Sequence, residues 1–214
     1  MVFYFSIQLI AIVADDMEVR LIDLANTDLQ LSYSGLTGPA LSVALCPKQK
    51  MIAASSGDGY LRIWDVKSCD LIKEFYCVPR ANSFRNAKLL CMYLPTIRCS
   101  LASFLFFAGR IDFHPVTAQY LAYPENKTVV LLDTSTWSKE RTLSTTEVNA
   151  FFSIVQFSPC GKFLAAASDN GDIVIWTVAN GELIGVSRHA SSIAVCAMVW
   201  NPKGNILQNI AITK

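Results

Sequence analysis

Residues 157–176, FSPCGKFLAAASDNGDIVIW, carry the pattern that decides the fold. A proline follows an apolar strand, a second apolar strand comes next, and a turn at Asn170-Gly171 leads to a third strand that ends in Trp176. Asn-Gly is a strong hairpin signal because both residues tolerate a positive φ. This stretch therefore predicts consecutive short antiparallel strands joined by tight turns.

The same unit recurs along the chain in register. In three copies a turn residue lies 11 positions after the proline, and the residue that closes the third strand lies 17 positions after it. The copies are Pro47, Asp58 and Trp64; Pro115, Asn126 and Leu132; and Pro159, Asn170 and Trp176. Residues 19–23 form a further copy without its proline, with Asp16 at the turn position.

The spacing of the repeats identifies their type. Pro115, Pro159 and a fourth anchor, Pro202, are 44 and 43 residues apart, within the ~40–45 residues of a WD40 repeat. Asp65 follows Trp64 as a Trp-Asp pair, and His189 stands in the degraded Gly-His position of the last unit. Several short strands per unit, tight turns and no helical period predict an all-β WD40 β-propeller.

The chain is too short for a closed ring. Seven blades at ~43 residues need about 300 residues, and the chain has 214. We therefore expect an incomplete propeller of about four blades plus a truncated one, with the blades in 10–91 and 110–204. Residues 205–214 would be a truncated end.

One interval between anchors is too long. Pro47 and Pro115 are 68 residues apart, and the excess coincides with the apolar stretch 92–109. We interpret 92–109 as translated non-coding sequence, such as an unspliced in-frame intron. The alternative is a genuine insertion loop, although exposed loops are rarely so apolar.

Composition narrows the class of protein. The chain has 18 Lys and Arg against 17 Asp and Glu, 52% hydrophobic residues and only 16% charged ones. These values exclude a disordered tail and a supercharged nucleic-acid arm. The apolar stretches 1–14 and 92–109 are too short or too interrupted for a membrane-spanning helix of about 20 residues, so we expect buried strands and no membrane partner.

No pattern of catalytic or metal-binding residues is present. The seven cysteines include no C-x-x-C and indicate buried thiols in a reducing compartment. The two histidines, His114 and His189, fit structural positions of the repeat, and no hydrolase, Walker or dinucleotide motif occurs. We therefore expect no enzyme activity, no cofactor, no metal and no small-molecule substrate.

With the repeat in register, the chain resembles the amino-terminal WD40 region of the WD-repeat and HMG-box DNA-binding protein family, a family of replisome adaptors. The residues that carry the resemblance are Asn86-Ala87-Lys88 with Cys91, Trp137-Ser138, residues 154–166, His189, Ala194-Val195-Cys196 and Trp200-Asn201-Pro202. The chain departs from the family pattern at residues 1–9, at 92–109 and after about residue 205, which puts both ends and the insert in doubt as native sequence.

The resemblance implies a nuclear, non-catalytic scaffold that couples the replicative helicase to DNA polymerase α and supports sister-chromatid cohesion. It also implies that the family's oligomerising region and HMG box lie beyond this chain. The basic residues are dispersed, so the sequence itself does not show direct binding of DNA or chromatin. The alternative is a generic WD40 module of another complex, such as a ubiquitin-ligase receptor or a trafficking coat. Partner contacts are expected in loops at 25–39, 67–85, 134–150 and 179–192.

Overall fold

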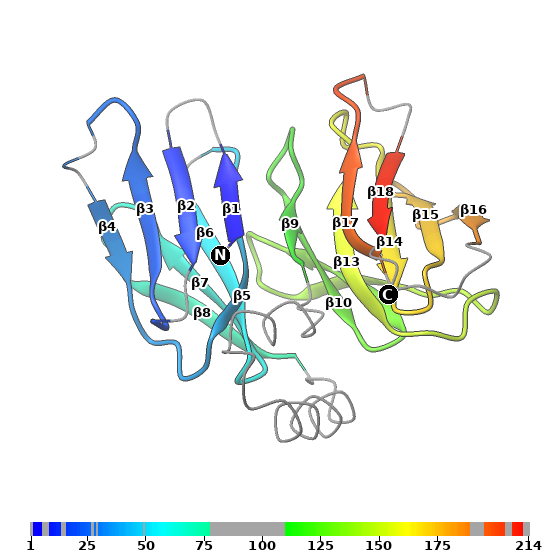
Figure 1. Cartoon of the computed structure of the whole chain (residues 1–214), viewed down its shortest axis with the longest axis horizontal. Helices are drawn as coiled ribbons and strands as arrows, with labels where there is room; N and C mark the ends of the chain where they lie inside the picture. The colour runs from blue at the N-terminus through cyan, green and yellow to red at the C-terminus, as the bar shows by residue number, and fades with distance from the viewer. Residues whose placement is uncertain are drawn as a thin grey trace, which may run out of the picture.

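The computed structural model describes residues 2–5, 9–13, 16–26, 28, 30–48, 50–77, 110–188, 195–203 and 207–211. In this part of the chain the regular structure consists of strands, which form an open array of small sheets (Figure 1). The described part contains no helix that is long and apolar enough to span a membrane.

Each small sheet is one blade, and its strands pair antiparallel in the order in which they occur along the chain. Blade 1 contains β1 (Val2–Phe5), β2 (Leu9–Val13), β3 (Val19–Asp23) and β4 (Gln30–Tyr33). Blade 2 contains β5 (Ala40–Leu45), β6 (Met51–Ser56), β7 (Tyr60–Asp65) and β8 (Leu71–Tyr76). Blade 3 contains β9 (Asp112–Phe113), β10 (Tyr120–Glu125), β11 (Thr128–Asp133) and β12 (Lys139–Leu143). Blade 4 contains β13 (Phe152–Phe157), β14 (Phe163–Ser168), β15 (Ile173–Thr177) and β16 (Leu183–Ser187). Blade 5 contains β17 (Val195–Trp200) and β18 (Leu207–Ala211).

Four four-stranded sheets and one two-stranded sheet confirm the predicted propeller of four blades plus a partial fifth. The first strand of each later blade packs against the blade before it. β5 contacts β1 and β2, β13 contacts β9 and β10, and β17 contacts β13 and β14. The first strands therefore form the inner side of the array.

The hydrophobic cores lie between blades. Leu21 and Tyr33 of blade 1 pack with Val43, Ile52 and Trp64 of blade 2, and three similar clusters join the later blades. Since both faces of the middle strands are covered, these strands are apolar along most of their length, as in the stretch Leu164–Ala167. Small alanines there let neighbouring sheets approach closely.

Two strands extend the sheets beyond the boundaries that the sequence suggested. β1 pairs with β2 from Val2↔Val13 to Phe5↔Ile10, although 1–9 were placed outside the blades. β18 pairs with β17 although 205–214 were expected to be a truncated end. An uncharged apolar stretch next to a strand is well suited to pairing with it. The repeat pattern did not predict β1 or β18 because neither strand contains an anchor proline. The insert 92–109 lies outside the described residues, so its interpretation stays a prediction.

Blades 3 and 4 are joined at their inner strands. The backbone N–H of Arg110 donates to the oxygen of Ser153 at 2.9 Å, and Arg110 forms a parallel bridge with Ile154. The N–H of Phe157 donates to Oδ2 of Asp112 at 2.9 Å. Burial of the carboxyl raises the pKa of Asp112 to about 7, against the opposing effects of the Phe157 N–H and the nearby Arg110 charge.

A second contact between these blades depends on a glycine. The Nδ1 atom of His114 accepts a hydrogen bond from the N–H of Thr117 at 3.1 Å, which leaves Nε2 to donate to the oxygen of Gly161 at 3.0 Å. Gly161 has a φ of 73°, and a Cβ atom on it would lie 2.3 Å from Cε1 of His114. Only glycine fits both the backbone conformation and the space.

Gly161→Ala should therefore lower the free energy of unfolding by about 2–4 kcal/mol, since the methyl group adds a clash to an unfavourable φ. The measurement is urea denaturation followed by circular dichroism. Gly185→Ala in β16 is the control, because a Cβ there meets no atom within 4 Å. An equal effect of the two substitutions would contradict this account of the contact.

Asp112→Asn tests the buried carboxyl. Because its pKa in the folded state lies above the ordinary value of 3.8, the carboxyl disfavours folding increasingly as the pH rises from about 4 through 7. The variant should thus be more stable than the parent at pH 8, and the difference should shrink toward pH 5. Thermal denaturation at several pH values measures this. Asp70→Asn, an exposed substitution, should change stability little at any of them.

Candidate interaction surface

Three kinds of turn connect the strands of a blade. Inner turns join the first and second strands and comprise residues 46–50, 114–119, 158–162 and 201–206. Hairpin turns join the second and third strands and comprise residues 14–18, 57–59, 126–127 and 169–172. Outer turns join the third and fourth strands and comprise residues 24–29, 66–70, 134–138 and 178–182. The anchors Pro47, Pro115, Pro159 and Pro202 lie in the inner turns. The residues predicted to form turns, Asp58, Asn126 and Asn170, lie in the hairpin turns, and His189 lies outside the described residues.

The residues that close the third strand occupy the same register in each blade. Trp64 pairs with Ile52, Leu132 with Leu121, and Trp176 with Leu164. All three are almost completely buried, so they belong to the cores between blades and cannot stack on a ligand. Asp65, the residue after Trp64, begins an outer turn, where its Oδ1 accepts the N–H groups of Lys67 and Ser68 at 2.8 and 3.0 Å.

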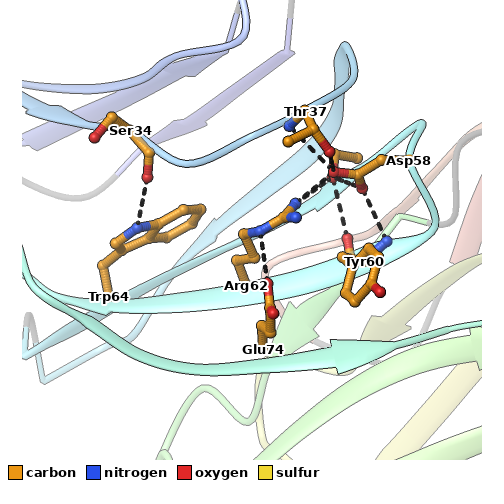
Figure 2. Close-up of polar contacts among 8 residues, drawn as sticks. Ser34, Thr37, Asp58, Tyr60, Arg62, Trp64 and Glu74 are labelled. Atoms are coloured by element: carbon orange, nitrogen blue, oxygen red, sulfur yellow. Dashed lines mark hydrogen bonds and ion pairs between the residues drawn. The ribbon is translucent and has the colours of Figure 1, made fainter.

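Asp58 is the centre of a polar network in blade 2 (Figure 2). Its carboxylate accepts hydrogen bonds from Oγ1 and N–H of Thr37 at 2.6 and 3.2 Å and from the N–H of Tyr60 at 3.0 Å. The hydroxyl of Ser56 donates to it as well, and Nη1 of Arg62 forms an ion pair with it at 2.7 Å. Burial opposes ionisation of Asp58, but these donors outweigh it and hold the pKa of the carboxyl well below its usual range.

The guanidinium of Arg62 is neutralised on two sides. Its Nε donates to Oε2 of Glu74 on β8 at 3.1 Å, and the residue is only 5% exposed. Its carbon Cζ lies 4.9 Å from the centre of the Tyr60 ring. Each charge of the network has an oppositely charged partner, and the arrangement supports the hairpin turn.

The same pair recurs in blade 1, where sequence reasoning missed it. Arg20 forms ion pairs with Asp16 and with Glu18, and Asp16 and Arg20 have the spacing of Asp58 and Arg62. The repeated Asp-x3-Arg spacing in the sequence could have predicted this ion pair. In blade 4 a valine, Val174, stands in the arginine position, and Asn170 instead donates to Oδ2 of Asp172 at 2.9 Å.

Outer turns show a second repeat that the sequence analysis missed. In blades 2, 3 and 4 the fifth residue of this turn, counting the last strand residue as first, has a positive φ: 60° at Cys69, 56° at Trp137 and 74° at Gly181. Each donates its N–H to the carbonyl of the last strand residue at 2.9–3.1 Å. Cysteine and tryptophan rarely adopt this conformation, so only Gly181 matches it by residue type, and the aspartates at 65 and 133 were the signal for the other two turns.

The outermost strand of a blade holds the outer turn of the next blade. Tyr33 of β4 donates from its hydroxyl to the oxygen of Val66 at 3.1 Å, and Phe75 of β8 lies 6.4 Å from the ring of Trp137. Leu143 of β12 lies against Gly181. We call these three contacts the peripheral clasps. At the corresponding position of β16, paired with Ile173, stands the exposed Ser187.

Each range expected to be a partner loop contains a strand. The ranges 25–39, 67–85, 134–150 and 179–192 contain β4, β8, β12 and β16 respectively, so they are loops only in part, and the expected partner contacts stay a prediction. These outer strands are exposed on much of their surface and lack the alternating or continuous apolar pattern that marks the others. Within the described ranges no three His, Cys, Asp or Glu side chains gather to hold a metal ion.

Comparison with known proteins places this array in a family. The family model "WDHD1 first WD40 domain" matches residues 2–213. Curated relatives named "WD repeat and HMG-box DNA-binding protein 1" are 29% identical in Mus musculus over 193 residues and 28% identical in Homo sapiens and Xenopus laevis. Each alignment covers 90% of this chain and 16% of the relative, so the chain spans about a sixth of their length.

Asp58→Ala should lower the free energy of unfolding by about 1–3 kcal/mol at pH 7, because it leaves Arg62 and several donors without their acceptor. Since the pKa of Asp58 is lowered in the folded state, its contribution is present above about pH 4 and is lost as the pH falls further. Urea denaturation at pH 7, 5 and 3 should show an equal deficit at the first two values and a smaller one at the third.

Asp16→Ala is the matched control for this prediction. Asp16 occupies the equivalent hairpin turn of blade 1, but its side chain is 42% exposed. Solvent screens such ion pairs, so the control should show no measurable deficit at any pH. A deficit as large as that of Asp58→Ala would mean that burial of the network is not what makes it stabilising.

Proposed function

The chain belongs to the family of the WDHD1 first WD40 domain, and on that premise we propose that this WD40 scaffold works without catalysis in the nucleus, linking the replicative helicase to DNA polymerase α. The observation that carries the proposal is the match of the family model over residues 2–213. A role in replication, chromatin and sister-chromatid cohesion follows from the same family membership.

The chemistry of the turns supports a scaffold. The charged groups of the blade 2 network, Asp58, Arg62 and Glu74, bind one another. The tryptophans at 64 and 176 are enclosed in the cores between blades. What remains available to other molecules is a wide surface of turns and outer strands, which suits protein contacts. The name of these relatives, "WD repeat and HMG-box DNA-binding protein 1", is consistent with a nuclear site of action.

Affinity purification from nuclear extract of replicating cells tests the proposal. The bait is the tagged chain, and the matched control is Trp64→Ala, which removes a large buried side chain from the core between blades 1 and 2. Subunits of the replicative helicase or of DNA polymerase α should be enriched on the parent bait over the control, as measured by quantitative mass spectrometry.

Two outcomes would contradict the proposal. Enrichment of cullin or vesicle-coat subunits in place of replication proteins would support the alternative, a WD40 module of another complex. Equal recovery of replication proteins on both baits would show that the association does not depend on the folded blades.

A further inference from the structure

Exposed large hydrophobic side chains are most numerous on β8 among the strands whose side chains the structure describes. Leu71, Ile72 and Tyr76 are 49%, 38% and 58% exposed, whereas β16 has two such side chains. On β12 the charged Lys139 pairs with the third strand where Leu71 does so on β8, and Glu140 follows it. Apolar side chains grouped on one exposed strand are typical of a surface that contacts another protein.

An aromatic pair belongs to the same strand. The ring of Tyr76 lies 5.2 Å from that of Tyr60 on β7, and the two residues are paired in the register of the strands. The repeat does not require an aromatic ring here. The position of Tyr60, two residues after the turn residue, holds Glu18 in blade 1, Thr128 in blade 3 and Asp172 in blade 4. The fold therefore does not account for this pair of tyrosines.

The polar network beside these rings has a net negative charge. Its carboxylates belong to Asp58 and Glu74, and its cation is Arg62. The lowered pKa of Asp58 keeps that carboxyl ionised at neutral pH. Glu74 is exposed, and it accepts the hydrogen bond from Arg62 through Oε2, which leaves Oε1 without a hydrogen bond from a described residue.

Arg62 shows how this part of blade 2 holds a guanidinium. Its Cζ lies 4.9 Å from the centre of the Tyr60 ring, and its Nε donates to Glu74 at 3.1 Å (Figure 2). A planar guanidinium can stack on an aromatic ring and bond a carboxylate at the same time, which a lysine ammonium does less well. Side chains two positions apart on a strand share a face, so Tyr76 and Oε1 of Glu74 offer the same two groups toward solvent.

We propose that this surface of β8, formed by Leu71, Ile72, Glu74 and Tyr76 with Tyr60 beside them, binds an apolar segment of a partner protein that carries an arginine. The arginine stacks on Tyr76 and donates to Glu74, while apolar side chains of the segment cover the start of the strand. Charge complementarity favours this partner because the network has one carboxylate more than it has cations. Tyrosine and arginine are also enriched among the residues that dominate binding energy at protein interfaces.

A second copy of the chain is a less suitable occupant. In a two-fold symmetric contact centred on Glu74, this carboxylate would meet its own counterpart, and like charges in opposite positions are destabilising. Lys73 does not offset them, because it pairs with Ile63, whose side chain lies in the core between blades 2 and 3, on the other face of the sheet.

This inference concerns the chemistry of one contact and does not rest on the partners named in the proposed function. The sequence analysis did not find it because β8 lies in a range expected to be a loop. The bond between Glu74 and Arg62 joins residues 12 positions apart, so no local pattern predicted the charge beside the tyrosines.

Selection of random twelve-residue peptides displayed on phage, with the whole chain as target, tests the proposal. Peptides selected on the parent should be enriched in arginine next to apolar residues, and those selected on the double variant E74Q/Y76T should not. A fluorescein-labelled peptide from the parent selection then serves as probe in fluorescence anisotropy. Its Kd should rise about three- to fivefold with E74Q or Y76T and with citrulline in place of its arginine, since ion pairs and cation–π contacts at exposed sites contribute modestly.

The matched control is E182Q/I184T, which removes an exposed carboxylate and an exposed apolar side chain from blade 4. It should bind the peptide like the parent, and circular dichroism should show all variants equally folded. Equal weakening by the control would overturn the assignment to β8. Selection of acidic peptides, or of none, would overturn the assignment to arginine. A dimer of the parent in sedimentation analysis that E74Q/Y76T abolishes would instead assign the surface to a second copy.

Discussion

No blade of this protein has a core of its own. A sheet of four short strands offers two apolar faces and almost no interior, so the large side chains are buried only where two blades meet. Tyr33 and Trp64 come from different blades, yet their rings lie 6.1 Å apart within one cluster. The turns and the register of the repeat place these faces so that each blade packs against the next.

This constraint explains which parts of the fold could be read from the sequence. Third strands that carry Trp64, Leu132 or Trp176 as their next-to-last residue must be apolar to fill the space between blades, and their turns need residues such as Asn170-Gly171. Both requirements produce the same residue types at a fixed spacing in the sequence. The outer strands are only half-covered, so polar and apolar residues serve equally there, and the sequence could not distinguish β12 from a loop.

The polar contacts between residues far apart in the chain could not be predicted from the sequence either. Asp58 could be placed in a turn, but its bond to Thr37 joins residues 21 positions apart, and that of Trp64 to the oxygen of Ser34 at 3.1 Å crosses between blades. Neither contact follows from a local pattern.

The peripheral clasps stiffen the array. Between blades 1 and 2, 2 and 3, and 3 and 4, a side chain of the outer strand contacts the following outer turn, so each of these junctions is closed at the inner strands and again at the rim. A junction held along one edge can hinge, whereas a junction held along two edges resists hinging. The first four blades therefore move together as a stiff segment, and a force applied to one blade is passed on to its neighbours.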